Sequence, residues 1–244
     1  MFKRGVLLFP VGVILPASKK KKRLFWKYKC EKKIVPEYGI AFFAVEELQN
    51  YTRIFKRHKI ENVVVLTDTG YKPYNFKLID GKDVFERMSA DYVRKYLKAC
   101  GDSASVTFVD KDFCEITERL VDLLCPICGK INLCTMCTDK AEAFSNKIME
   151  CCGAVVNVVE CEKIIDSDVA VVVNDFKVKY HEKCLVIGKT SHFSGNRKVE
   201  DFHIPFGIKV PFNMPRIVFK QCVELAGKKK SLTFIGFLYI ILIL

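Results

Sequence analysis

The stretch that decides the fold is residues 131–160, which read INLCTMCTDKAEAFSNKIMECCGAVVNVVE. It opens with a short apolar run, and its middle carries apolar residues at helical spacing, namely Ala141, Phe144, Ile148 and Cys152. Gly153 follows this stripe, and a glycine just past a helix takes the left-handed conformation that ends the helix. A second apolar run begins at Val155. The stretch therefore predicts a strand, a helix and a second strand in succession.

The same succession recurs elsewhere in the chain. The other predicted helices that lead to a glycine and a strand are Tyr92–Cys100 before Gly101, Ile116–Cys128 before Gly129, and Arg216–Ala226 before Gly227. Two helices begin with acidic capping patterns, Asp112-x-x-Glu115 and Asp139-x-x-Glu142. Strands that alternate with helices in this way form βαβ units, in which helices cover both faces of a mainly parallel sheet.

Two parts of the chain depart from this alternation. Residues 169–180 hold an apolar run, the pair Asn174-Asp175 and an alternating run, which together predict a β-hairpin. Residues 1–40 predict an N-terminal arm or strand pair with a lysine-rich loop. We therefore expect a three-layer, Rossmann-like α/β fold with a mainly parallel sheet, an added β-hairpin and an N-terminal arm. The expected domain is residues 41–227, and residues 228–244 form a basic, then apolar tail.

The chain is strongly basic, with a formal net charge of +12. The run Lys19–Arg23 could contact an anionic surface such as nucleic acid or phospholipid headgroups, and a solvated loop is the alternative. Aromatic and basic residues interleave only over Phe25–Lys29, so the sequence argues against a nucleic-acid partner.

The C-terminal tail has its own character. Lys228–Lys230 precede the apolar stretch Leu232–Leu244, which as a helix reaches about 20 Å, short of the roughly 30 Å of a bilayer core. A buried final strand, an anchor lying on a membrane surface and a tail altered relative to its relatives stay open. Membrane association through this tail is one of the partner hypotheses.

Of the 12 cysteines, Cys100, Cys128 and Cys152 each precede a glycine at a predicted helix end, Cys134 lies in an apolar strand, and Cys184 begins one. Free cysteine packs as a small buried hydrophobe, and thiols stay reduced in the cytosol. The placement therefore predicts a cytoplasmic protein with core thiols rather than a disulfide framework.

From Ser105 to Asn174, the order of elements resembles part of a Rossmann cofactor domain of the shikimate-dehydrogenase-like type. The resemblance rests on residues 131–160 followed by DSDVAVVVN at 166–174. It implies a dehydrogenase fold and a nicotinamide cofactor. However, Asp110-Lys111-Asp112-Phe113 stands where such domains carry G-x-G-x-x-G, and carboxylates at a helix start repel phosphate. The cofactor is therefore unknown from the sequence.

Two C-x-x-C pairs form a candidate metal site, with Cys125, Cys128, Cys134 and Cys137 as ligands. Four thiolates suit tetrahedral zinc. The gap between the pairs is much shorter than in zinc ribbons, so buried structural cysteine is the main alternative and a redox-active pair is another.

A second candidate site follows the apolar run that ends at Leu66. Asp68-Thr69-Gly70 matches the tripeptide of aspartic proteases, but that fold is all-β. At the carboxyl end of a strand, Asp68 and Asp110 could hold a cation or a sugar hydroxyl, whereas turn chemistry is the favoured explanation of the same residues. The following loop adds candidate ligand contacts, namely Tyr71, Lys72, Tyr74 and Asn75.

These observations lead to one main hypothesis and two alternatives. The main hypothesis is a non-catalytic or degenerate Rossmann-like protein that binds a small ligand or a protein partner at the carboxyl ends of its strands. The first alternative is an oxidoreductase that uses NAD(P) or a nucleotide through an atypical loop. The second is a zinc-stabilised interaction protein.

Overall fold

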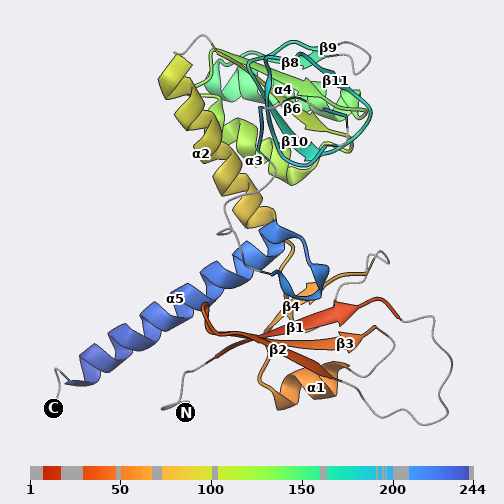
Figure 1. The fold of residues 1–244 in the computed structure, drawn as a ribbon. Coiled ribbons are helices and arrows are strands. Elements are labelled where there is room, and N and C mark those ends of the chain that lie inside the picture. Colours follow the sequence, from red (N-terminus) through yellow and green to blue (C-terminus); the bar gives the residue numbers. More distant parts are fainter. Residues whose placement is uncertain are drawn as a thin grey trace. The chain divides into compact units, whose positions relative to one another are not determined.

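The computed structural model divides the chain into two compact units (Figure 1). Unit 1 comprises Met1–Gly81 and His203–Leu244, and unit 2 comprises Lys82–Phe202. This grouping differs from the expected single domain over residues 41–227, because the end of the chain returns to the first unit. The described residues are 8–17, 30–47, 51–67, 73–100, 104–159, 164–190, 192–193, 195, 197–199 and 209–241, with side chains up to 228.

Unit 1 is built on a five-stranded sheet in the order β2-β3-β1-β4-β5. Its strands are β1 (Phe9–Leu15), β2 (Glu31–Val35), β3 (Ile40–Glu46), β4 (Asn62–Val65) and β5 (Lys77–Leu78). Every neighbouring pair is parallel except β2 and β3, which pair antiparallel. Strand β1 lies between β3 and β4, so part of the expected N-terminal arm is a central strand.

One helix covers each face of this sheet, giving three layers (Figure 1). On one face, α1 (Tyr51–Arg57) buries Phe55 against Ile14 and Val63. Gly12 makes room for this ring, since a Cβ there would lie 2.7 Å from it. On the other face, α5 (Arg216–Ile241) packs through Phe219.

Helix α5 begins at Arg216, as the sequence predicts. It continues through Gly227 to Ile241, so the predicted helix end at Gly227 and the strand after it are wrong. Short helix η1 (Pro211–Asn213) precedes it. No helix in the described part of the chain combines the length and the apolar character needed to cross a membrane.

Unit 2 holds a six-stranded parallel sheet in the order β13-β12-β10-β6-β7-β8. Its strands are β6 (Ser105–Asp110), β7 (Lys130–Cys134), β8 (Val156–Val159), β10 (Val169–Asn174), β12 (Leu185–Ile187) and β13 (Lys198–Val199). When these six strands are numbered 1 to 6 in chain order, their order across the sheet from β8 to β13 is 3-2-1-4-5-6. This is the strand order of dinucleotide-binding Rossmann domains. The strand order reverses between β6 and β10, and ligands of such sheets bind at the carboxyl ends of the two strands that flank this switch point.

The helices of unit 2 are α2 (Lys82–Cys100), α3 (Glu115–Leu124) and α4 (Thr138–Cys152). Helix α4 ends at Gly153, which has φ 68° and confirms the glycine stop predicted there. Helix α2 starts at Lys82 rather than Tyr92, and α3 ends at Leu124, before the predicted Cys128.

The predicted hairpin over residues 169–180 is wrong. Strand β10 pairs in parallel with β6 and β12, and β11 (Lys179–Tyr180) pairs instead with β9 (Ile164–Ile165). Four consecutive residues of β10 are buried, Val169, Ala170, Val171 and Val172, which is the pattern of a central strand covered on both faces. Val178, beside β11, packs in the same buried cluster as Ala170 and Val172. The short strands β9 and β11 therefore cover β10 in place of a helix.

Strands β6 and β10 are tied together at their amino ends by Ser105 and Asp168. The Asp168 carboxylate accepts hydrogen bonds from the Ser105 backbone N–H at 2.8 Å and the Ser105 hydroxyl at 2.9 Å. These bonds, the backbone one first, lower the pKa of Asp168. A carboxyl with a lowered pKa in the folded state adds stability above its unfolded pKa, and this stability is lost as the pH falls through the folded pKa.

We therefore expect Asp168→Asn to be less stable than the wild type at neutral pH, by less than about 1 kcal/mol because the group is exposed. The difference should shrink as the pH falls below about 4. Urea denaturation across this pH range measures it. The same substitution at exposed Asp166 is the control, and an equal, pH-independent effect of both substitutions would contradict the assignment.

Candidate functional site

The candidate site is the carboxyl edge of the six-stranded sheet, at the switch point between β6 and β10. A bulge at the end of β10 shapes it: Val172 pairs with Val109, but the next pair is Asn174 with Asp110. Val173 is therefore the extra residue of the bulge. Because of this shift, Asn174 stands opposite Asp110 and both residues face the loop that leads into α3.

Asp110 is 1% exposed, and its carboxylate is occupied by the start of α3. It accepts hydrogen bonds from the backbone N–H of Cys114 at 2.6 Å, the hydroxyl of Thr117 at 2.5 Å and the backbone N–H of Asp112 at 3.3 Å. Cys114 is the N-cap residue of α3 and makes no side-chain cap. The predicted capping roles of Asp112 and Asp139 are therefore wrong, because Asp110 caps α3 from the strand end and Cys137 is the N-cap of α4.

The loop between β6 and α3 is filled by a side chain rather than left open. Phe113 is fully buried and has φ 48°, in the left-handed region that favours glycine. Its ring packs edge-on against Phe144 at 5.5 Å between centroids. Lys140 of α4 lies over the ring and donates a hydrogen bond to the Phe113 carbonyl at 2.5 Å. A dinucleotide-binding loop needs small residues here so that the backbone can approach a pyrophosphate.

Further hydrogen bonds connect the loops that follow three strands of the sheet. The Asn174 side-chain amide donates to the Asp112 carboxylate at 2.6 Å, and the Lys111 N–H donates to the Asn174 carbonyl at 3.2 Å. The Lys111 carbonyl in turn accepts from the Met136 N–H and the Thr135 hydroxyl, each at 3.2 Å. The loops after β6, β7 and β10 are thus joined to one another across the switch point.

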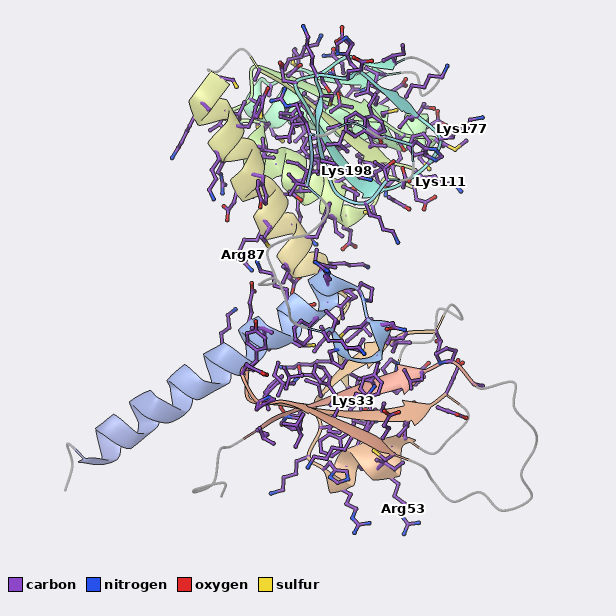
Figure 2. All side chains as sticks on the ribbon, viewed as in Figure 1. Lys33, Arg53, Arg87, Lys111, Lys177 and Lys198 are labelled. Carbon is purple, nitrogen blue, oxygen red and sulfur yellow. The ribbon has the colours of Figure 1, made fainter. Side chains whose placement is uncertain are left out.

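The exposed groups at this edge include the hydrogen-bonded pair Asp112 and Asn174. Met136 is 65% exposed, and Lys111 and Lys177 are also exposed. Figure 2 shows the two lysine side chains on the same side of unit 2. Neither lysine forms an ion pair with a residue that the structure describes. The edge therefore presents two lysines and a thioether beside the Asp112 carboxylate, which is hydrogen-bonded to Asn174.

The structure does not bring the four candidate zinc ligands together. Cys125 and Cys128 precede β7, whereas Cys134 ends it and Cys137 follows it. An extended five-residue strand separates the two pairs by about 15 Å. Among the described residues, no three His, Cys, Asp or Glu side chains form a group that could hold a metal ion.

The environment of these thiols favours the core interpretation. Cys134 is 1% exposed and packs in the same buried cluster as Val109 and Val172. Burial, and then the neighbouring Cys125, raise the pKa of Cys128 to about 11. A thiol with a raised pKa is protonated at neutral pH, and the thiolate is the form that attacks a disulfide.

We expect the protein purified under reducing conditions to carry no zinc. Native mass spectrometry should give the bare polypeptide mass, and a chelator should leave the melting temperature unchanged. Cys134→Ala and Cys137→Ala should likewise leave the metal content at zero. A zinc adduct that disappears in either variant would restore the metal site.

The residues of the other candidate site are divided by the fold. Asp68, Thr69, Gly70, Tyr71 and Lys72 lie outside the described residues. Tyr74 and Asn75 lie in unit 1, whereas Asp110 lies in unit 2. Because Lys77 at the start of β5 pairs with Asn62 at the start of β4, Tyr74 and Asn75 lie at the amino end of these strands rather than at the expected carboxyl end.

Sequence reasoning identified Asp110 but missed the residues that surround it. The sequence predicts a hairpin turn at Asn174, and it gives no site role to Thr117 or Lys140. The end of an apolar run followed by Asn174-Asp175 was the available signal, since a polar pair at a strand end also fits a ligand-binding edge.

No protein-family model matches the chain, and no curated protein matches its sequence. Among solved structures, quinate dehydrogenase from Corynebacterium glutamicum in complex with NAD is similar to this chain. The two are 11% identical, and the match covers 68% of this chain and 71% of that one with a TM-score of 0.35. Such a likeness carries no argument about activity. The strand order and register themselves make unit 2 a Rossmann-like α/β domain with a parallel sheet.

Proposed function

We propose that this protein is a non-catalytic, Rossmann-like binding protein whose switch point no longer accepts a dinucleotide. The observation that carries the proposal is the buried Asp110 carboxylate, which accepts hydrogen bonds from the first turn of α3. In dinucleotide-binding domains the pyrophosphate takes this place at the helix start. A carboxylate already satisfies these donors, and its negative charge repels a phosphate.

The surrounding residues support the same conclusion. Phe113 fills the loop in which a pyrophosphate would need backbone access, and the exposed carboxylate of Asp112 adds a second negative charge. The hydrogen bonds from Asn174 and Met136 hold the loop in place. Opening the site would therefore require the loss of several bonds as well as the displacement of a buried ring.

The binding role belongs to the exposed part of this edge. Lys111 and Lys177 supply positive charge, and Met136 supplies a flexible apolar contact of the kind found at adaptable binding surfaces. We propose that a small ligand or a protein partner with a negatively charged group binds there. The described cysteines are free thiols, which supports a cytoplasmic location for this function.

An oxidoreductase is the second candidate, and the 3-2-1-4-5-6 strand order is the observation that favours it. In that case the chain would use NAD(P) through an atypical loop, as the sequence resemblance to shikimate-dehydrogenase-like proteins implies. Ligand binding would have to displace the Asp110 carboxylate from α3.

Turnover assays separate the two candidates. The full chain is incubated with NAD or NADP and a panel of hydroxy acids, and formation of the reduced nicotinamide is followed by absorbance. The proposal predicts no turnover above that of a heat-denatured sample. Sustained reduction of the cofactor, absent from a Lys111→Glu variant, would overturn the proposal and favour the oxidoreductase.

A further inference from the structure

The outer face of α1 and the turn that follows it carry a dense group of positive charges. Between Tyr51 and Ile60 the chain has four Lys or Arg residues and one histidine but no acidic residue. All five of these side chains are exposed, namely Arg53, Lys56, Arg57, His58 and Lys59. Figure 2 shows Arg53 projecting away from the sheet. Lys56, Arg57 and Lys59 form no ion pair with any residue in the described ranges.

The charged face extends from α1 onto the neighbouring strands. The His58 ring stacks on Phe43 of β3 with 4.3 Å between centroids. The Lys32 ammonium of edge strand β2 lies 5.5 Å from the centroid of the same Phe43 ring. Lys32 and His58 are thus gathered over one buried ring. This arrangement holds two cationic or hydrogen-bonding groups beside the cations of α1.

An exposed aromatic residue lies near α1. Tyr74 is 84% exposed and sits in a turn in which Asn75 has φ 67°. Two residues later, the Phe76 ring packs against Phe55 at 5.5 Å and Tyr51 at 6.2 Å, both on α1. Two residues span at most about 7 Å, so the turn holds Tyr74 close to α1. The structure thus places an exposed aromatic residue near a basic helix.

We propose that this surface, made of Lys32, the exposed cations of α1 and Tyr74, binds single-stranded nucleic acid. Cations that follow the phosphodiester backbone, together with an exposed ring on which a base can stack, are the elements of such sites. A bilayer surface instead selects several exposed apolar residues beside the cations. On α1 the residues other than the cations are buried or half-buried, which favours nucleic acid over lipid.

This inference departs from the expectation drawn from the sequence, which argued against nucleic acid because basic and aromatic residues interleave only over Phe25–Lys29. The interleaving at α1 exists in space and not along the chain. The inference concerns unit 1 and is independent of the function proposed for the edge of unit 2.

The test uses the full chain and fluorescence anisotropy with labelled oligouridylate and oligothymidylate at several salt concentrations. We expect both to bind. Lys56→Glu with Arg57→Glu should weaken binding at least about tenfold and flatten the plot of log affinity against log salt by about 1.4, since each lost phosphate contact removes about 0.7. Tyr74→Ala should weaken binding about tenfold and leave the salt slope unchanged, because stacking involves no counterion release.

Lys98→Glu with Lys147→Glu is the matched control, because both residues are exposed on helices of unit 2 and the charge change is the same. It should bind like the wild type. Circular dichroism checks that each variant folds, and Lys56→Gln with Arg57→Gln replaces the charge reversal if that variant unfolds. Equal weakening by test and control variants would overturn the proposal. So would binding to phosphatidylserine vesicles without binding to either oligonucleotide, which would assign the surface to a membrane.

Discussion

Gly188→Ala is expected to lower the free energy of unfolding by about 3 kcal/mol or more. Gly188 follows β12 and has φ 114°, which side-chain-bearing residues rarely adopt. A Cβ there would lie 2.4 Å from the backbone oxygen of Val172 in β10, an atom that cannot move without displacing the strand. The clash would part β10 from β12 beside the candidate site. Urea denaturation followed by circular dichroism measures the loss.

Gly153→Ala provides the matched control for this prediction. Gly153 also has a positive φ, 68°, but a Cβ there would meet no atom within 4 Å. Only backbone strain opposes that substitution, so we expect a loss of about 1–2 kcal/mol. If the two variants lose equal stability, the close approach of Gly188 to β10 is not what restricts that position.

Asp110→Ala should lower the free energy of unfolding by about 3 kcal/mol, because it leaves the start of α3 and the Thr117 hydroxyl without their acceptor. Asp110→Asn keeps one oxygen acceptor and should lose less. Asp139→Asn is the control, since Asp139 is exposed in the first turn of α4 and should change stability by less than about 0.5 kcal/mol. A loss for Asp110→Ala no larger than for Asp139→Asn would show that Asp110 does not cap α3.

Much of unit 2 could be predicted from local sequence. The helix that ends at Gly153 and the strands on either side of it follow from apolar spacing and one left-handed glycine, and the structure confirms them. The hairpin prediction failed because an apolar run followed by Asn174-Asp175 fits both a hairpin and the end of a buried parallel strand. Only the partners of β10, which come from distant parts of the chain, distinguish the two.

The division into two units also depends on distant contacts. Helix α5 packs on the sheet of unit 1 through residues such as Phe219 and Cys222. Its periodicity predicts a helix but does not indicate which sheet the helix covers. The local rule that a glycine ends a helix fails at Gly227, because α5 continues through this residue.

The candidate site could be located from the sequence but not interpreted. A carboxylate at the end of an apolar strand identified Asp110, and turn chemistry was already an alternative to ligand binding. The decisive partners depend on three-dimensional features: the bulge at Val173 turns Asn174 toward the loop, and the left-handed Phe113 buries its ring. Neither feature follows from residue spacing.

The most direct test of the closed switch point is a titration of isotope-labelled full-length protein with NAD, followed through the backbone amide resonances of Asp112 and Cys114. These two amides donate to Asp110 and would be the first to contact a pyrophosphate. The account predicts that neither resonance shifts at millimolar NAD. Saturable shifts of both, accompanied by shifts at Asn174, would show that the site opens and binds the dinucleotide, and would contradict the account.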